Sequence, residues 1–147
     1  MGSANKKVRS KKEKLTNEEW ISKRASSFRA SSLARAKRLG IDTSTVPTIS
    51  EIKEYLKSSF PLKCYITDTE ISTLVAELDH KIPISRHGSF DISNVAITSK
   101  WYNMAKGDMT DVEFVELLSA ISSWEDKGKS VISRLVRSNK IYNRIKK

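Results

Sequence analysis

The fold of this chain is decided by residues 77–110, which read ELDHKIPISRHGSFDISNVAITSKWYNMAKGDMT. Two stretches have the apolar residues and flanking turn residues that are typical of strands, namely 76–84 (AELDHKIPI) and 94–98 (NVAIT). The polar loop between them contains Gly88, and a short helix follows that we expect to end at Lys106. The order predicted for this part of the chain is therefore strand, loop, strand, helix.

Helices on both sides of this stretch are predicted by capping boxes, in which a threonine that caps the helix is followed three residues later by a glutamate. The pairs are Thr16 with Glu19, Thr48 with Glu51, and Thr110 with Glu113. The first helix should run to Leu39 and stop at Gly40. It carries many basic residues and few apolar ones, so we expect it to have little core to join. A short strand over 62–67 and a last helix over about 130–146 complete a fold predicted to be α+β and mainly helical.

The charge of the chain is large, positive and unevenly distributed. Its 147 residues carry a formal net charge of +10. Residues 1–40 hold twelve Lys and Arg against three acidic residues, 41–123 hold seven against twelve, and 124–147 hold eight against two. A basic excess of this size indicates a polyanionic partner. An acidic middle between two basic arms fits a carboxylate-bearing site that the flanking charge brings to a phosphate backbone, and DNA is the partner we expect.

The chain divides into four predicted parts. They are a flexible basic tail over 1–15, a basic helical region over 16–60, a core over 61–124 and a basic C-terminal helix over 125–147. The single cysteine, Cys64, excludes disulfides within the chain and cysteine-rich zinc sites, and we interpret it as a small buried side chain. No apolar run approaches the ~20 residues of a membrane span and no secretory signal is present, so the prediction is a cytoplasmic protein without a membrane partner.

Four polar residues of the deciding stretch carry its chemistry. Asp79 and His80 are neighbours on the first strand, Asn94 begins the second, and Asn103 lies on the helix. Neighbouring residues on a strand point to opposite faces, so Asp79 and His80 flank one phosphate only if the strand twists or bulges. Asp and Asn oxygens are hard ligands that suit Mg²⁺, and an imidazole that titrates near neutral pH suits the deprotonation of water. These groups suffice for metal-assisted hydrolysis of a phosphodiester.

The same stretch resembles the ββα-metal motif of the HNH endonucleases, in particular of the small phage-type homing or nicking members. The matching positions are Leu78-Asp79-His80, Ile82-Pro83, Ser85-Arg86, Gly88, Asn94-Val95, Asn103-Met104 and Lys106-Gly107. Thirteen residues separate His80 from Asn94, and eight separate Asn94 from Asn103. The similarity covers residues 62–124, roughly half of the chain. It implies a compact ββα-metal core flanked by basic helices, in a bacterial or phage-infected cell.

The resemblance implies a role for each site residue. His80 would be the general base that activates water. Asp79 and Asn103 would hold one divalent ion, Mg²⁺ or Mn²⁺. Asn94 would bridge backbone groups across the loop between the strands and so fix His80. The products would carry 3′-hydroxyl and 5′-phosphate ends.

Residues near this motif refine the expectation. Arg86 and Lys106 could contact the DNA phosphates beside the cut, with a plain surface position as the alternative. We expect His87 to be a solvated loop residue. Many relatives bind a structural zinc through two cysteine pairs, but Cys64 and Thr67 occupy the spacing of the first pair here, so no structural zinc is expected.

Other functions stay open beside DNA cleavage. A non-catalytic nucleic-acid-binding protein that keeps the fold would share the basic arms and would bind with a strong dependence on salt. A peripheral membrane protein held by the basic helix is disfavoured, because the apolar face of that helix is too sparse for insertion. A single HNH site cuts one strand, so a monomer would nick, and double-strand cleavage would need a homodimer or two successive events.

Overall fold

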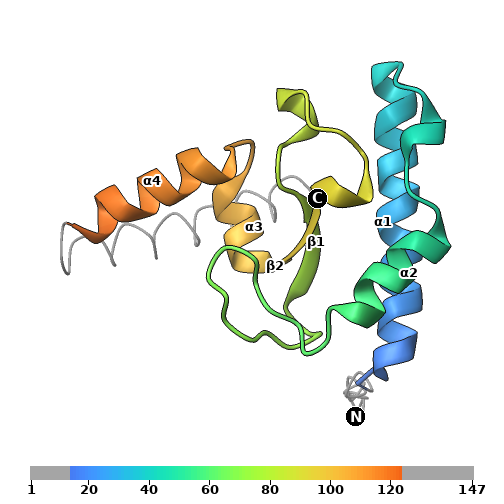
Figure 1. The fold of residues 1–147 in the computed structure, drawn as a ribbon, viewed down its shortest axis with the longest axis horizontal. Helices are drawn as coiled ribbons and strands as arrows, with labels where there is room; N and C mark the ends of the chain where they lie inside the picture. Colours follow the sequence, from blue (N-terminus) through green and yellow to red (C-terminus); the bar gives the residue numbers. More distant parts are fainter. Residues whose placement is uncertain (1–13, 124–147) are drawn as a thin grey trace, which may run out of the picture.

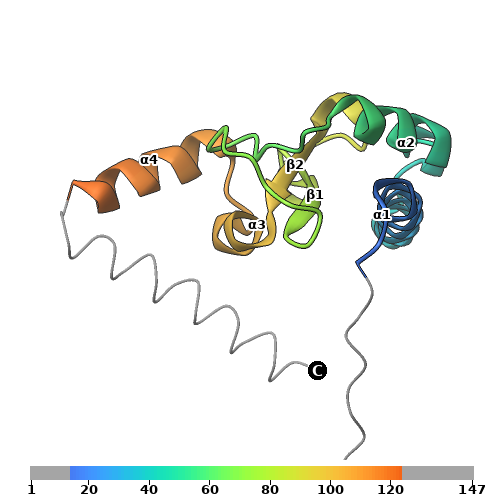
Figure 2. The same ribbon diagram turned by 90° about the horizontal axis from the view of Figure 1, so that it is seen from below.

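The computed structural model of this chain describes residues 14–123. The structure is α+β and mainly helical, as the sequence predicts. In chain order its elements are α1 (Asn17–Leu39), α2 (Ile49–Ser58), β1 (Ala76–His80), β2 (Val95–Ser99), α3 (Lys100–Lys106) and α4 (Asp111–Ser122). In Figures 1 and 2, α1 and α2 lie on one side of the two strands and α3 and α4 on the other. The predicted helix over 130–146 and most of the predicted tail lie outside the described residues.

All three predicted capping boxes are present. The hydroxyl of Thr16 accepts a hydrogen bond from the backbone N–H of Glu19, whose carboxylate accepts one from the backbone N–H of Thr16. Helices α2 and α4 begin in the same way. These bonds stabilise the helix starts, because the first N–H groups of a helix have no partner within it. Gly40 ends α1 with a φ of +66°, a left-handed conformation that a residue without Cβ adopts at little cost.

The two strands pair in an antiparallel sheet. Within the described residues this sheet has no third strand, and its register runs from Ala76 opposite Ser99 to His80 opposite Val95. The first strand therefore ends at His80, earlier than the predicted limit at residue 84. The chain leaves the ladder there and forms a 3₁₀ turn that begins at Ile84. One edge of β1 thus pairs with β2, and the other edge faces α1.

The prediction of a strand over 62–67 is wrong. The segment makes one isolated bridge, between Lys63 and Glu70, and otherwise forms turns. A strand needs a continuous ladder of hydrogen bonds to a neighbour, and a favourable local composition does not supply one. Cys64 in this segment is fully buried, with its Sγ 3.6 Å from Oγ1 of Thr98, which agrees with its interpretation as a small core side chain.

Helix α1 joins the hydrophobic core, contrary to the expectation from its composition. Ile21 and Ala25 lie in one cluster with Leu56 of α2 and with apolar residues of both strands. Ala36 lies in a second cluster with Phe90 from the loop between the strands. Both alanines are 0% exposed. Small side chains let the helix backbone approach the sheet closely, which explains how a helix with few large apolar residues is held in place.

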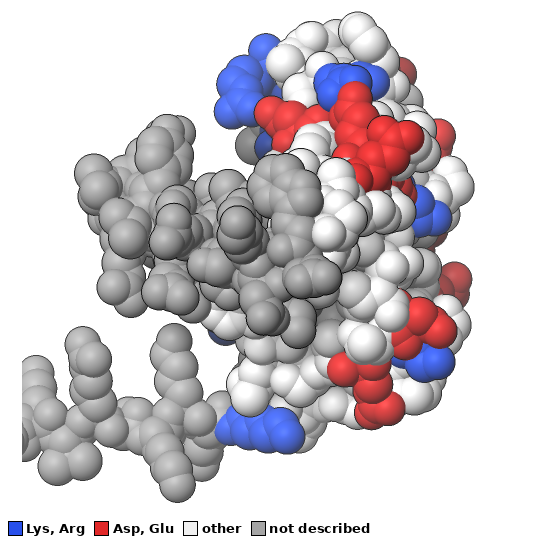
Figure 3. Space-filling model, turned by 90° about the vertical axis from the view of Figure 1, so that its left-hand side faces the viewer, with Lys and Arg blue, Asp and Glu red and all other residues white. Residues whose placement is uncertain are grey.

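Charge is distributed unevenly over the described surface. Figure 3 shows the side of the molecule from which α4 projects, where acidic side chains form an upper and a lower group, each with basic side chains beside it. Helix α1, across the sheet from α4, carries six Lys and Arg against two Glu. None of the described helices combines the length and the apolar character that crossing a bilayer requires.

Candidate active site

A cleft of about 550 Å³ lies between α1 and the edge of β1 that does not pair with β2. Asp79 and His80 of β1 and Asn103 of α3 border one side of this cleft, and Phe28 and Arg35 of α1 border the other. Three consecutive residues of β1 reach the cleft, although successive side chains on a strand point to opposite faces. The cleft therefore runs along the strand edge, which side chains of both faces can reach. The pairing register of β1 is regular here, so Asp79 and His80 border the same cleft without a bulge in the strand.

The carboxylates of β1 hold α3 against one face of the sheet. Oε2 of Glu77 accepts a hydrogen bond from Nδ2 of Asn103 at 2.8 Å. Two residues further along the strand, Oδ2 of Asp79 accepts one from Nζ of Lys106 at 3.0 Å. Residues two apart share a face of a strand and residues three apart share a face of a helix, so the two bonds set one register between β1 and α3. Glu77 was not singled out from the sequence, although its position two residues before Asp79 is a signal that points to it.

His80 lies on the other face of β1, against α1. It is 8% exposed, and its ring centroid lies 5.2 Å from that of Phe28 and 5.6 Å from that of Phe90. Its Nε2 is enclosed and has no hydrogen-bond partner among the described residues. The pKa of His80 is lowered to about 4, chiefly because the ring is buried; Asp79 opposes this shift, and the positive charges of Arg35 and Lys106 add to it. The ring is therefore neutral at neutral pH, which is the form that can accept a proton.

Asn94 ties together the loop that follows His80. Its Oδ1 accepts a hydrogen bond from the N–H of Ile82 at 2.9 Å, and its Nδ2 donates to the carbonyls of Ile82 at 2.9 Å and Ser89 at 2.8 Å. These are the backbone bridges that the resemblance implies for Asn94. A Cβ at Gly88 would lie 1.9 Å from the carbonyl oxygen of Ile82, so the same close approach requires glycine. The backbone directly after His80 is held at both sides of the loop.

Lys106 is buried, and the prediction that it contacts DNA does not agree with its position. It is 1% exposed. Its Nζ donates to Oδ2 of Asp79 at 3.0 Å and to the carbonyl of His80 at 3.2 Å, and lies 3.7 Å from Oδ1 of Asp111. An ammonium group can be buried when it is paired and hydrogen-bonded in this way. Lys106 instead joins β1 to α3 and to the first residue of α4.

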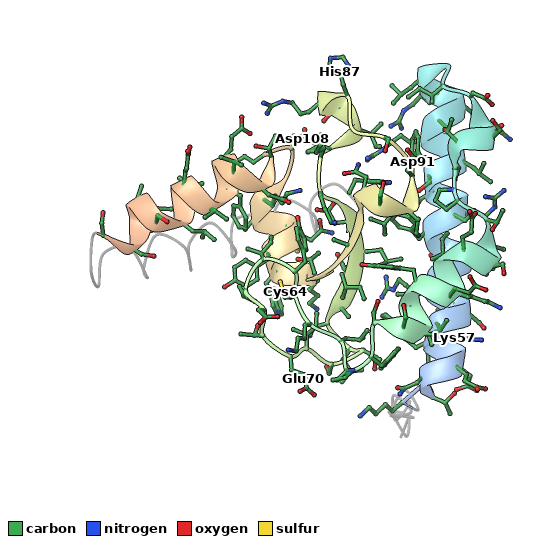
Figure 4. The ribbon with its side chains drawn as sticks, viewed as in Figure 1. Lys57, Cys64, Glu70, His87, Asp91 and Asp108 are labelled. Atoms are coloured by element: carbon green, nitrogen blue, oxygen red, sulfur yellow. The ribbon has the colours of Figure 1, made fainter. Side chains whose placement is uncertain are left out.

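Arg86 and His87 lie in the loop between the strands. The guanidinium of Arg86 donates to both carboxylate oxygens of Glu113, at 2.8 and 3.1 Å. These bonds, together with those from Thr110, lower the pKa of Glu113 to about 2. Arg86 is exposed, so its contact with a DNA phosphate stays a prediction. A phosphate bound there would compete with Glu113 for the guanidinium group. His87 is exposed and points outward from the molecule in Figure 4, as expected of a solvated loop residue.

Helix α1 brings positive charge to its side of the cleft. Phe28, Arg35 and Arg38 border the cleft, and their spacing of seven and three residues places them on one helix face. Within the described residues, neither arginine forms an ion pair with an acidic side chain. The sequence shows both as basic residues of a helix. It does not show that this face meets the site, because the packing of α1 against β1 is a long-range property.

The oxygen donors of the cleft fit a hard divalent ion. Within the described part of the chain, Lys106 engages only one oxygen of Asp79. Glu77 accepts from the amide nitrogen of Asn103, which leaves the amide oxygen as the free end. Two protein oxygens suit Mg²⁺, which keeps several of its waters. Residues 14–123 contain no cluster of three or more His, Cys, Asp and Glu side chains that could hold an ion, so an ion here would depend on Asp79, Asn103, water and substrate oxygens.

No protein-family model, curated protein or solved structure matches the chain. The functional interpretation therefore depends on the residues of the cleft and on their geometry.

Proposed function

We propose that this protein is a metal-dependent endonuclease of the HNH type, which hydrolyses phosphodiester bonds in DNA. One observation carries the proposal: Asp79, His80 and Asn103, which come from a strand and a helix, border a single cleft. The order of β1, loop, β2 and α3 and the three hydrogen bonds of Asn94 support it, because they agree with what the resemblance implies.

His80 accepts the proton of the attacking water in this proposal. Its lowered pKa keeps the imidazole unprotonated at neutral pH, but the same shift makes it a weak base. Orientation must then contribute much of the rate. The rings of Phe28 and Phe90 restrict the imidazole, and Lys106 holds the carbonyl of His80.

Asp79 and Asn103 are the residues that would hold a Mg²⁺ or Mn²⁺ ion. Such an ion stabilises negative charge on the phosphate and on the leaving oxygen. Residues behind the ligands orient them, as is common at metal sites: Lys106 holds one oxygen of Asp79, and Glu77 holds the amide nitrogen of Asn103. Water attack on phosphorus with departure of the 3′ oxygen leaves 3′-hydroxyl and 5′-phosphate ends.

Cleavage of supercoiled plasmid and of circular single-stranded DNA, with Mg²⁺ or with EDTA, tests this function. His80→Ala should lose cleavage by about a hundredfold or more while binding persists, because a general base contributes at least that factor. His87→Ala is the matched control, since it removes the other histidine from an exposed position. Equal cutting by His80→Ala and the parent would contradict the assignment, as would a parent protein that cuts neither DNA.

A non-catalytic nucleic-acid-binding protein is the second candidate, and one observation favours it. The ammonium of Lys106 lies 3.0 Å from Oδ2 of Asp79, so that carboxylate already has a positive partner. A divalent ion would have to use the remaining oxygen. This candidate predicts salt-dependent binding of DNA without cleavage at any concentration of Mg²⁺ or Mn²⁺.

A further inference from the structure

Two arginines on α1 face the cleft without a carboxylate partner. Arg35 and Arg38 are both exposed and both border the cleft that contains Asp79 and His80. No ion pair joins either of them to an acidic residue within 14–123. A guanidinium group carries several N–H donors in a planar fork that matches phosphate oxygens. Two such groups at one cleft suit a ligand with more than one phosphate.

The other arginines of α1 are engaged elsewhere, so the arrangement is specific. Arg29 donates hydrogen bonds to the carbonyls of Val46 and Pro47, which attach α1 to the segment before α2. Arg24 lies over the ring of Trp20, 5.6 Å from its centroid. Neither of these two borders the cleft. The arginines that border the cleft are thus the two of α1 whose guanidinium groups are not held by a backbone carbonyl or a tryptophan ring.

The dimensions of the cleft restrict what can reach His80. Its volume of about 550 Å³ is in the range of a site for a small ligand. A duplex, whose major groove alone is about 12 Å wide, could meet the mouth of this cleft but could not enter it as a whole. His80 is 8% exposed and lies against Phe28 of α1, which borders the same cleft. A paired strand would have to bring its complement past α1, whereas an unpaired strand can lie along the edge of β1.

We propose that the cleft between α1 and β1 binds single-stranded DNA, with Arg35 and Arg38 holding phosphates next to the one that is cut. Proteins that bind single strands combine a basic groove that follows the backbone with aromatic side chains that contact the bases. Phe28 supplies an aromatic surface within this cleft. The identity of the substrate rests on the proposed nuclease function, but the binding of a single strand does not.

The experiment compares a labelled oligonucleotide of mixed sequence with its duplex, using the full-length protein. Binding is measured by fluorescence anisotropy in EDTA over a range of salt concentrations, and cleavage is measured separately with Mg²⁺. Arg35→Ala and Arg38→Ala should each weaken binding of the single strand by about tenfold. Each should also reduce the slope of log affinity against log salt concentration by roughly the amount that one phosphate contact contributes. Duplex binding, to which the basic residues outside the cleft contribute, should change by no more than about twofold. Lys37→Ala is the matched control, because it removes an exposed positive charge from the same helix outside the cleft.

The outcomes separate this inference from the proposed function. Selective loss of single-strand binding supports the inference even if no DNA is cut. Equal losses for both DNA forms, or losses no larger than for Lys37→Ala, would overturn it. Cleavage that is as fast on the duplex as on the single strand would also overturn it, while leaving the nuclease function intact. Thermal unfolding checks that each variant folds, and Arg35→Lys should restore part of the binding if charge at this position is what matters.

Discussion

The ammonium of Lys106 is the most deeply buried charge of the site, and its removal gives a sharp test. Lys106→Met keeps an unbranched apolar side chain of similar length but removes the charge. In the native protein Nζ bonds to Asp79 and to the carbonyl of His80. The substitution leaves both acceptors without this donor in a poorly solvated place.

The expected loss of stability follows from the exposure of the partners. Breaking a buried ion pair by removing one member costs about 3–5 kcal/mol. The side chain of Asp79 is 20% exposed, so water recovers part of its solvation, and the lower figure of about 3 kcal/mol applies. Asp111 adds little, because it is 37% exposed and 3.7 Å away. A loss of this size lowers Tm by about 12 °C at about 4 °C per kcal/mol.

Unfolding in denaturant at neutral pH measures this loss. Lys63→Met is the matched control, because Lys63 forms an exposed pair with Asp68, in which the side chains are 54% and 89% exposed. Removing that pair should cost less than about 1 kcal/mol. In an Asp79→Asn background, Lys106→Met should cost about 1–2 kcal/mol less than in the parent, because the stranded negative charge is gone. A cost for Lys106→Met no larger than that for Lys63→Met, or one unchanged by Asp79→Asn, would refute the reasoning.

Further outcomes concern the loop and the histidine. Burial lowers the pKa of His80 from 6.5 to about 4, so between these pH values the unfolded chain binds a proton that the folded chain does not. The free energy of unfolding should therefore fall by up to about 3 kcal/mol as the pH drops from 6.5 to 4, and His80→Gln should flatten this slope in denaturant titrations. Asn94→Ala removes three hydrogen bonds to the loop and should lower the free energy of unfolding by about 2–4 kcal/mol. The amide hydrogen of Ile82 should then exchange faster, and an unchanged exchange rate would count against the bridging role of Asn94. Gly88→Ala should cost more than about 2 kcal/mol, because its Cβ would meet backbone at 1.9 Å. Gly107→Ala should cost less, because its Cβ would meet nothing within 4 Å and only the positive φ of +53° opposes it; calorimetry that ranks the two the other way would contradict the steric argument.

Much of the site follows from the sequence, because its spacing is encoded locally. The order of β1, loop, β2 and α3 places Asp79, His80 and Asn103 on elements that follow one another in the chain. The bonds of Asn94 to Ile82 and Ser89 also span a single loop. These features depend on contacts between residues that are close in the chain.

The charge partners of the site were not predictable in the same way. Arg86 and Lys106 look alike in the sequence, as basic residues beside the motif. In the structure Arg86 is exposed and pairs with Glu113, 27 residues away, whereas Lys106 is buried against Asp79, also 27 residues away. Whether a lysine is solvated or buried depends on what the rest of the chain places around it, and a local pattern does not contain that information.

The sequence by itself determined where α1, α2 and α4 begin, because capping involves groups only three or four residues apart, as in Thr16 with Glu19. Only the tertiary structure decided that α1 packs against the free edge of β1. That packing depends on small buried residues such as Ala25 and Ala36, which carry no clear pattern. It also encloses His80 and brings Arg35 to the cleft. A helix cap is stabilised by bonds within one turn, whereas a cleft exists only where two distant segments bury apolar surface against a common core.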